Sequence, residues 1–125
     1  VSAGSRLEEA KMVIPDADQP LGTHVDLAAA IKEAVDVPVV AVGRLQTREA
    51  CEEVLGEGKA DLVAVGRQLL TDPFWPVKLE EGRDDEVVEC IACNAKCSGN
   101  LEKGESISCV MNNEAGQEYL RYQDK

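Results

Sequence analysis

The chain has 125 residues and a formal net charge of −11 at pH 7, an excess of negative charge that argues against nucleic acid and anionic membranes as partners. Apolar residues make up 44% of it and aromatic residues only 3%, so we expect a core built mostly from Val, Leu, Ile and Ala. No long apolar run is present, and the sequence therefore predicts no membrane insertion.

The first helix is predicted after a strand end at residues 1–4 and a long loop at residues 5–21. Thr23 is a candidate N-cap for this helix, with Asp26 three residues later in an arrangement similar to a capping box. Four apolar residues share one predicted helical face: Leu27, Ile31, Ala34 and Val35. His24, the only histidine, is expected to be exposed at the start of the helix.

Two short apolar runs, residues 37–42 and 60–65, are typical of strands that are buried on both faces of a parallel sheet. Between them, Thr47 is predicted to cap a helix that ends at Gly56 and Gly58. The buried face of this helix is expected to comprise Ala50, Cys51, Val54 and Leu55. We interpret Cys51 as an inert core residue.

A short helical turn is expected at residues 67–70, followed by a helix with Pro73 in its first turn that runs to about Glu81. Phe74 and Trp75 are expected to pack this helix against the rest of the protein. The alternating order predicts an α/β fold with about three βα units, a parallel sheet and helices outside it. We assign residues 1–84 to these units and residues 85–125 to a cysteine-rich segment.

Both predicted strands end in the dipeptide Gly-Arg, at Gly43-Arg44 and Gly66-Arg67. Glycine lets a ligand approach the backbone, the next helix offers free N–H groups, and arginine adds charge-assisted hydrogen bonds. Two neighbouring strands with these features could form a cup for a phosphate group. The alternative is a pair of ordinary βα turns with solvated arginines.

Four cysteines follow in the pattern C-x2-C-x3-C-x11-C: Cys90, Cys93, Cys97 and Cys109. Four thiolates this close together can hold a [4Fe–4S] cluster or a tetrahedral zinc ion. The x3 gap and the distant fourth cysteine are more typical of iron–sulfur loops than of paired zinc knuckles. Cysteines used in this way fit a reducing compartment, so we expect a cytoplasmic protein.

These motifs, in this order, resemble those of the last two strands in the old yellow enzyme family, the NADH:flavin oxidoreductases. The resemblance rests on residues 37–44, 60–67 and 70–73, and it covers nearly the whole chain. The cysteines, with residues 112–116, are similar to the iron–sulfur branch that includes bacterial 2,4-dienoyl-CoA reductase and trimethylamine dehydrogenase. The resemblance implies the C-terminal portion of a (β/α)8 TIM barrel, followed by an iron–sulfur loop segment.

The resemblance also implies cofactors and a function. Gly43, Arg44, Gly66 and Arg67 would hold the FMN phosphate, and the four cysteines would ligate a [4Fe–4S] cluster. In such enzymes electrons pass from NAD(P)H through FAD and the cluster to FMN, which reduces an activated alkene. FAD and NAD(P)H are then expected in a domain outside this chain, and the remaining barrel strands would come from the same gene or a separate subunit.

The expected activity is therefore that of a flavin-dependent ene-reductase acting on a small molecule. Whether the protein forms a homo-oligomer is left open. The 125-residue chain alone is expected to be inactive, because it holds about three of eight βα units. Its catalytic residues stay unknown, since residues 4–9 contain no histidine where many reductases of the family have one. Two other interpretations are a stand-alone iron–sulfur electron carrier and a structural zinc module.

Overall fold

The computed structural model describes residues 1–3 and 13–122, and it divides into two compact units, Val1–Val65 and Gly66–Lys125. The predicted strand end at residues 1–4 and the loop at 5–21 lie partly outside the described residues. Residues 1–3 are not in a strand, although the N-terminal amine of Val1 donates a hydrogen bond to the Val40 carbonyl. The predicted division into residues 1–84 and 85–125 stays a prediction.

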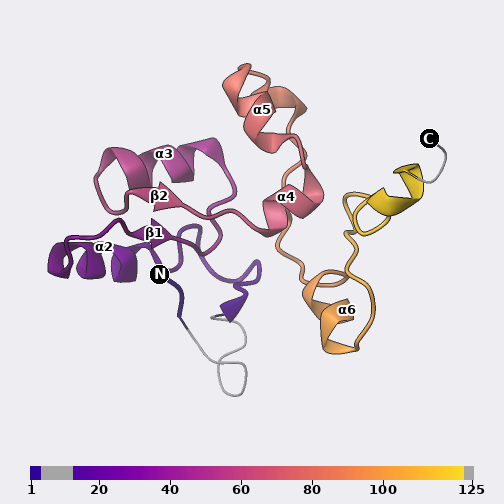
Figure 1. Ribbon diagram of the computed structural model, residues 1–125, viewed down its shortest axis with the longest axis horizontal. Helices are drawn as coiled ribbons and strands as arrows, with labels where there is room; N and C mark the ends of the chain where they lie inside the picture. The colour runs from indigo at the N-terminus through magenta and orange to yellow at the C-terminus, as the bar shows by residue number, and fades with distance from the viewer. Residues whose placement is uncertain (4–12, 123–125) are drawn as a thin grey trace. The chain divides into compact units, whose positions relative to one another are not determined.

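The first unit contains two parallel strands and two helices. Strand β1 (Val40–Ala41) pairs with β2 (Leu62–Val63), with Val40 opposite Leu62. Helix α2 (Val25–Ala34) contacts β1, and helix α3 (Arg48–Gly56) contacts β2, as Figure 1 shows. The predicted parallel βα arrangement is therefore confirmed, with strands shorter than the apolar runs.

Helix α3 follows its sequence signals. Thr47 Oγ1 accepts a hydrogen bond from the Ala50 N–H at 3.2 Å, as expected for an N-cap. Gly58 ends the helical segment in the left-handed region, with φ of +68°. Cys51 and Val54 are buried while Leu55 is exposed. Burial, reinforced by the charge of Glu52, raises the pKa of the Cys51 thiol, so Cys51 stays neutral as a core residue.

The predicted start of α2 is wrong. Thr23 Oγ1 donates to the Pro20 carbonyl at 2.7 Å, and the residue at the N-cap position is His24, whose side chain makes no capping hydrogen bond. His24 is only 1% exposed, contrary to the expectation. The reason is Gly43, whose φ is +123°: a Cβ there would lie 2.8 Å from His24 Cδ2, so the missing side chain makes room for the ring.

The expected apolar face of α2 is also wrong in this chain. Val25 and Ala28 are buried, whereas Leu27, Ile31 and Val35 are about two-fifths exposed. Residues 25 and 28 are one helical turn apart, so the buried stripe is narrow. The wider apolar stripe on α2 is therefore left uncovered by the described residues.

The second unit is built from short helices and loops. After α4 (Arg67–Thr71) come α5 (Trp75–Glu80), the 3-10 helix η1 (Asp84–Glu86), α6 (Ser98–Glu102) and the 3-10 helix η2 (Glu118–Tyr122). The helical turn predicted after the second strand is confirmed. None of the helices that the structure describes has both the length and the apolar character needed to cross a membrane.

Helix α5 begins two residues later than predicted. Pro76, not Pro73, lies in its first turn, and the carboxylate of Asp72 accepts from the Phe74 N–H at 3.2 Å just before it. Trp75 is buried as expected, but Phe74 is 67% exposed, so its predicted packing role is wrong. The side chain of Phe74 precedes the helix and does not share its buried face.

Candidate functional site

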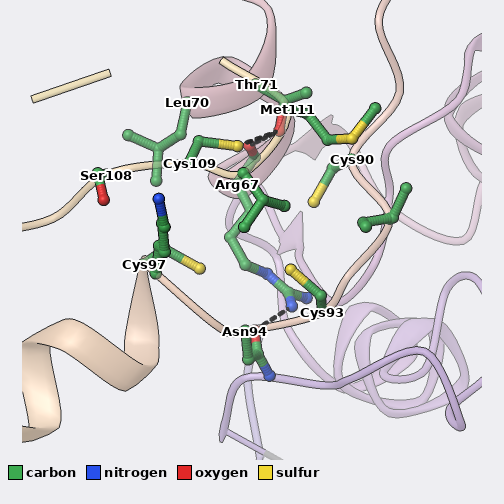
Figure 2. Close-up of a pocket in the computed structure, with 13 residues that line it drawn as sticks. Arg67, Leu70, Thr71, Cys90, Cys93, Asn94, Cys97, Ser108, Cys109 and Met111 are labelled. Atoms are coloured by element: carbon green, nitrogen blue, oxygen red, sulfur yellow. Dashed lines mark hydrogen bonds between the residues drawn. The ribbon is translucent and has the colours of Figure 1, made fainter. Parts of the chain in front are cut away.

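The four cysteines of the C-x2-C-x3-C-x11-C pattern line one pocket in the second unit. Figure 2 shows their sulfur atoms facing the interior of this pocket. None of the four is in a disulfide; Cys90 is buried, Cys97 and Cys109 are half-buried, and Cys93 is exposed. Apolar side chains complete much of the wall: Leu70, Ile91, Val110 and Met111. The pocket is thus a partly shielded site lined by free thiols.

The backbone around Cys93 is strained in a way that shapes the pocket. Ala92 and Asn94 have φ of +51° and +55°, a region that costs residues with a Cβ free energy. Ala92 is only 1% exposed, and its N–H donates to Cys90 Sγ at 3.4 Å. The two turns curl the segment so that Cys90 and Cys93 face the same space.

Helix α4 fixes the segment that carries Cys90. Gln68 is 1% exposed; its Nε2 donates to the Val88 carbonyl and its Oε1 accepts from the Cys90 N–H, both at 2.8 Å. One turn later, Asp72 Oδ2 accepts from the Val88 N–H at 3.1 Å. These three side-chain hydrogen bonds hold the backbone of residues 88–90, as the backbone hydrogen bonds of a neighbouring strand would. Cys90 is therefore positioned by the polar side chains of Gln68 in α4 and of its C-cap Asp72, which the sequence pattern did not identify.

Asp72 is a buried carboxylate with a specific partner. Lys78 Nζ lies 2.6 Å from Asp72 Oδ2 and also donates to the Glu86 carbonyl at 2.8 Å. Burial opposes ionisation of Asp72, but the hydrogen bonds from Lys78, Val88 and Phe74 outweigh it and hold the pKa of this carboxyl below its usual value. The carboxylate stays charged and joins α4, α5 and the segment before Cys90.

The same helix also holds the segment that carries Cys109. Thr71 Oγ1 lies 3.4 Å from Cys109 Sγ, and both are labelled in Figure 2. Asn112 Nδ2 donates to the Leu70 carbonyl at 2.8 Å. Helix α4 therefore contacts both ends of the cysteine pattern within five residues.

The loops between the cysteines are held by backbone contacts. Cys97 stands at the N-cap of α6, and the Ser108 N–H donates to the Lys96 carbonyl at 3.1 Å. Gly116 packs directly on this loop: a Cβ there would lie 2.0 Å from the Ile107 carbonyl oxygen. The Ala-Gly pair near the end of the chain therefore serves close packing beside Cys109.

The donor set of four cysteines is that of a [4Fe–4S] cluster or a structural zinc ion. Among residues 1–3 and 13–122, no three His, Cys, Asp or Glu side chains lie close enough together to hold a single ion. Zinc bonds of about 2.3 Å would bring tetrahedral thiolate sulfurs to about 3.8 Å from one another. A cubane cluster places each thiolate on a different iron, which spreads the sulfurs around a wider space. The four cysteines that line the pocket supply the thiolate ligands that either group needs.

Arg67, predicted as a phosphate ligand, lies in the wall of the cysteine pocket. Its Nη1 donates to Asn94 Oδ1 at 2.5 Å, shown as a dashed line in Figure 2. Its partner in the motif, Gly66, has open space where a Cβ would stand. The guanidinium thus brings positive charge to the rim of the site, where a sequence pattern alone would not have placed it.

The other Gly-Arg pair lies in the first unit. Arg44 has φ of +52°, and its Nη1 donates to the carbonyls of Ala17, at 3.3 Å, and Gln19. Its Nε is buried and has no hydrogen-bond partner among the described residues. Carbonyl groups orient a guanidinium without neutralising it, so Arg44 keeps its charge for an anion. A joint phosphate cup of both pairs stays a prediction, because the pairs belong to separate units.

Comparison with known proteins shows which family the chain is similar to. Residues 2–86 match the NADH:flavin oxidoreductase / NADH oxidase family. An NADH oxidase from Thermoanaerobacter brockii is 44% identical over 98 residues, which are 78% of this chain and 15% of the relative. A cinnamate reductase from Clostridium sporogenes is 34% identical over 104 residues, which are 83% of this chain and 16% of the relative.

A solved structure agrees with these matches. The 6-hydroxypseudooxynicotine amine oxidase from Pseudomonas geniculata N1 superposes with a TM-score of 0.82 at 29% identity, over 87% of this chain and 16% of its own. The chain thus spans about one sixth of the length of its relatives. The parallel βα units and this superposition identify the fold as the C-terminal portion of an α/β barrel of the (β/α)8 type. The chain belongs to the NADH:flavin oxidoreductase / NADH oxidase family.

Proposed function

We propose that the chain is part of an FMN- and [4Fe–4S]-dependent oxidoreductase, in which Cys90, Cys93, Cys97 and Cys109 hold the cluster. The observation that carries this proposal is one pocket lined by four cysteines, none of them in a disulfide, in a chain of a flavin-dependent family. The C-x2-C-x3-C-x11-C spacing is more typical of iron–sulfur loops than of paired zinc knuckles, which favours a cluster over structural zinc. Such a cluster is best kept in a reducing cytoplasm.

The residues of this chain would bind and shield the two groups. Arg44 and Arg67, each after a glycine, offer guanidinium charge to the phosphate of FMN. Leu70, Ile91 and Met111 would supply apolar surface beside the cluster. When bound, the two groups supply the redox chemistry, with electrons from NAD(P)H reaching FMN through the cluster.

For the substrate, we propose the reduction of an activated alkene, of the type carried out by 2,4-dienoyl-CoA reductases. The relatives named NADH oxidase and cinnamate reductase support NADH as the donor and an unsaturated acid derivative as the acceptor. The second candidate is amine oxidation, which the amine oxidase structure favours. In the complete protein, flavin reduced by NADH and reoxidised by cinnamate supports the first, whereas flavin reduced directly by an amine supports the second.

The rest of the barrel would complete the enzyme. The uncovered apolar side chains of α2, Leu27, Ile31 and Val35, support this, because a neighbouring barrel element would bury them. The 125-residue chain alone should therefore not turn over substrate, while still offering the cysteine pocket to a cluster. A stand-alone electron carrier would instead transfer electrons without the rest of the barrel and without any flavin.

The proposal is tested by analysis of iron, sulfide and zinc in the anaerobically purified chain, together with its absorption spectrum. We expect a brown protein with about four irons per chain. Cys93→Ser should reduce iron to background, because it removes one thiolate ligand. Cys51→Ala is the matched control: its thiol is buried in α3, outside the pocket, and iron should be unchanged. Colourless protein with one zinc per chain, even after anaerobic reconstitution with iron and sulfide, would leave a structural zinc module.

A further inference from the structure

The hydroxyl of Thr71 lies between a carbonyl oxygen and a cysteine sulfur. Thr71 is only 4% exposed, and its Oγ1 lies 3.4 Å from Cys109 Sγ and 3.2 Å from the Arg67 carbonyl, one helical turn earlier. A threonine hydroxyl carries one proton, so it donates to one of these groups at a time. Which group receives the proton depends on the state of Cys109.

The hydrogen bond that Thr71 makes depends on whether Cys109 is a thiol or a metal-bound thiolate. As a thiol, Cys109 can donate its own proton to Thr71 Oγ1, which leaves the hydroxyl proton for the Arg67 carbonyl. As a metal ligand, Cys109 is a thiolate and can only accept. Hydrogen bonds to an ionised acceptor are roughly twice as strong as neutral ones, so the hydroxyl proton should then turn to Cys109 Sγ.

The position of this hydroxyl is fixed from both sides. Thr71 is the last residue of α4, and the neighbouring Leu70 carbonyl accepts from Asn112 Nδ2, which ties the segment after Cys109 to the helix. Thr71 is almost fully buried and Cys109 is half-buried, so water competes little for the hydroxyl. A hydrogen bond in such surroundings is electrostatically stronger than one in water.

We propose that Thr71 sets the reduction potential of the cluster by donating a hydrogen bond to the ligand sulfur of Cys109. This inference rests on the proposed function, in which Cys109 ligates a [4Fe–4S] cluster. Reduction adds one electron to the cluster and breaks no bond, and the added negative charge is shared with the ligand sulfurs. A donor aimed at one of those sulfurs stabilises the reduced form more than the oxidised form, and so raises the potential.

The test is a redox titration of the complete protein, followed by the EPR signal of the reduced cluster, with iron content measured on the same samples. Thr71→Val replaces the hydroxyl by a methyl group of similar size. At the wild-type midpoint potential, its ratio of reduced to oxidised cluster should fall about threefold to tenfold, and tenfold corresponds to about 59 mV for one electron. Thr71→Ser restores the hydroxyl and should recover most of the wild-type potential.

Every outcome separates this inference from the proposed function. Wild-type protein without iron overturns the proposed function itself. Full iron content with an unchanged potential in Thr71→Val overturns the inference about Thr71 and leaves the cluster in place. If Thr71→Val loses iron, Thr71→Ala supplies the measurement, because it removes the hydroxyl without adding volume. Iron loss in both variants, with folding retained by circular dichroism, assigns Thr71 to holding the cluster and also overturns the inference.

Discussion

Each of the two units of the chain is stabilised internally by a different kind of interaction. In the first, two helices contact a parallel pair of strands, and the buried residues are mainly apolar. In the second, short helices and loops depend on hydrogen bonds between polar side chains and backbone groups, made by Gln68 of α4, by its C-cap Asp72 and by Asn112. The first unit is a regular scaffold, whereas the second is an irregular segment arranged around the cysteines.

This difference has an energetic consequence. Truncation of one apolar side chain in a regular element costs the free energy of burying that side chain, and the backbone hydrogen bonds of the element persist. Removal of a side chain-to-backbone bond in the second unit leaves buried N–H and C=O groups without partners, which costs about 1–3 kcal/mol for each group. The geometry of the cysteine pocket should therefore be more sensitive to single polar substitutions than the βα scaffold is.

The largest expected effect is that of Gln68→Leu. This substitution keeps a similar volume but removes the part-buried hydrogen bond to the Val88 carbonyl and the buried one from the Cys90 N–H. We expect a loss of about 3 kcal/mol in the free energy of unfolding of the second unit. Faster hydrogen exchange at residues 88–90 and a large loss of iron should accompany it.

Gln68→Glu is the matched control for this prediction. Its carboxylate can still accept from the Cys90 N–H, but it cannot donate to the Val88 carbonyl, so the loss should be intermediate. Equal iron content in wild type, Gln68→Glu and Gln68→Leu would show that α4 does not position Cys90.

The next effect concerns Lys78 and the pH dependence of stability. The folded pKa of Asp72 lies below its unfolded value of about 3.9, so the stabilisation by Asp72 is present above that value and is lost as pH falls through the lower, folded pKa. Lys78→Met keeps Asp72 buried but removes its ion pair. The pKa of Asp72 should rise, and the protein should lose about 2 kcal/mol at pH 7.

Urea unfolding of wild type and Lys78→Met between pH 3 and 7 measures this effect. The gap in stability between wild type and variant should be largest near pH 7. It should shrink as pH falls below the unfolded pKa of Asp72, about 3.9, because the wild type then loses a stabilisation that the variant no longer has. Two curves that stay parallel over this range would mean that Asp72 does not depend on Lys78. A surface pair such as Arg48–Glu52 on α3 is a suitable control, since exposed pairs contribute little.

The sequence predicted the scaffold better than the site. Apolar runs and the Thr47 cap identified the parallel strands and α3, because these signals are local and periodic. The burial of His24 could not be predicted in this way, since it depends on space beside Gly43, nineteen positions away. The apolar face of α2 was also mispredicted, because periodicity does not tell which elements are present to cover it.

In the second unit, the spacing of the cysteines indicated a common site, and all four line one pocket. The residues that arrange them were missed. Gln68 lies in α4 and Asp72 is the C-cap of that short helix, and their four-residue separation is the one signal that could have identified them. Their partners are backbone groups sixteen to twenty-two positions later, and no side-chain pattern marks such bonds.

The smallest effect is expected in the first unit, from Thr47→Ala. The substitution removes the acceptor for the Ala50 N–H at the start of α3 and should cost about 1 kcal/mol. The freed N–H lies at a helix end that water can reach, so the penalty of an unpaired buried group does not apply. Hydrogen exchange should accelerate in the first turn of α3, Thr47→Ser should restore protection, and iron content should match wild type. Iron loss as large as that of Gln68→Leu would mean that the scaffold and the cysteine segment respond as one body, and the contrast between the two units would fail.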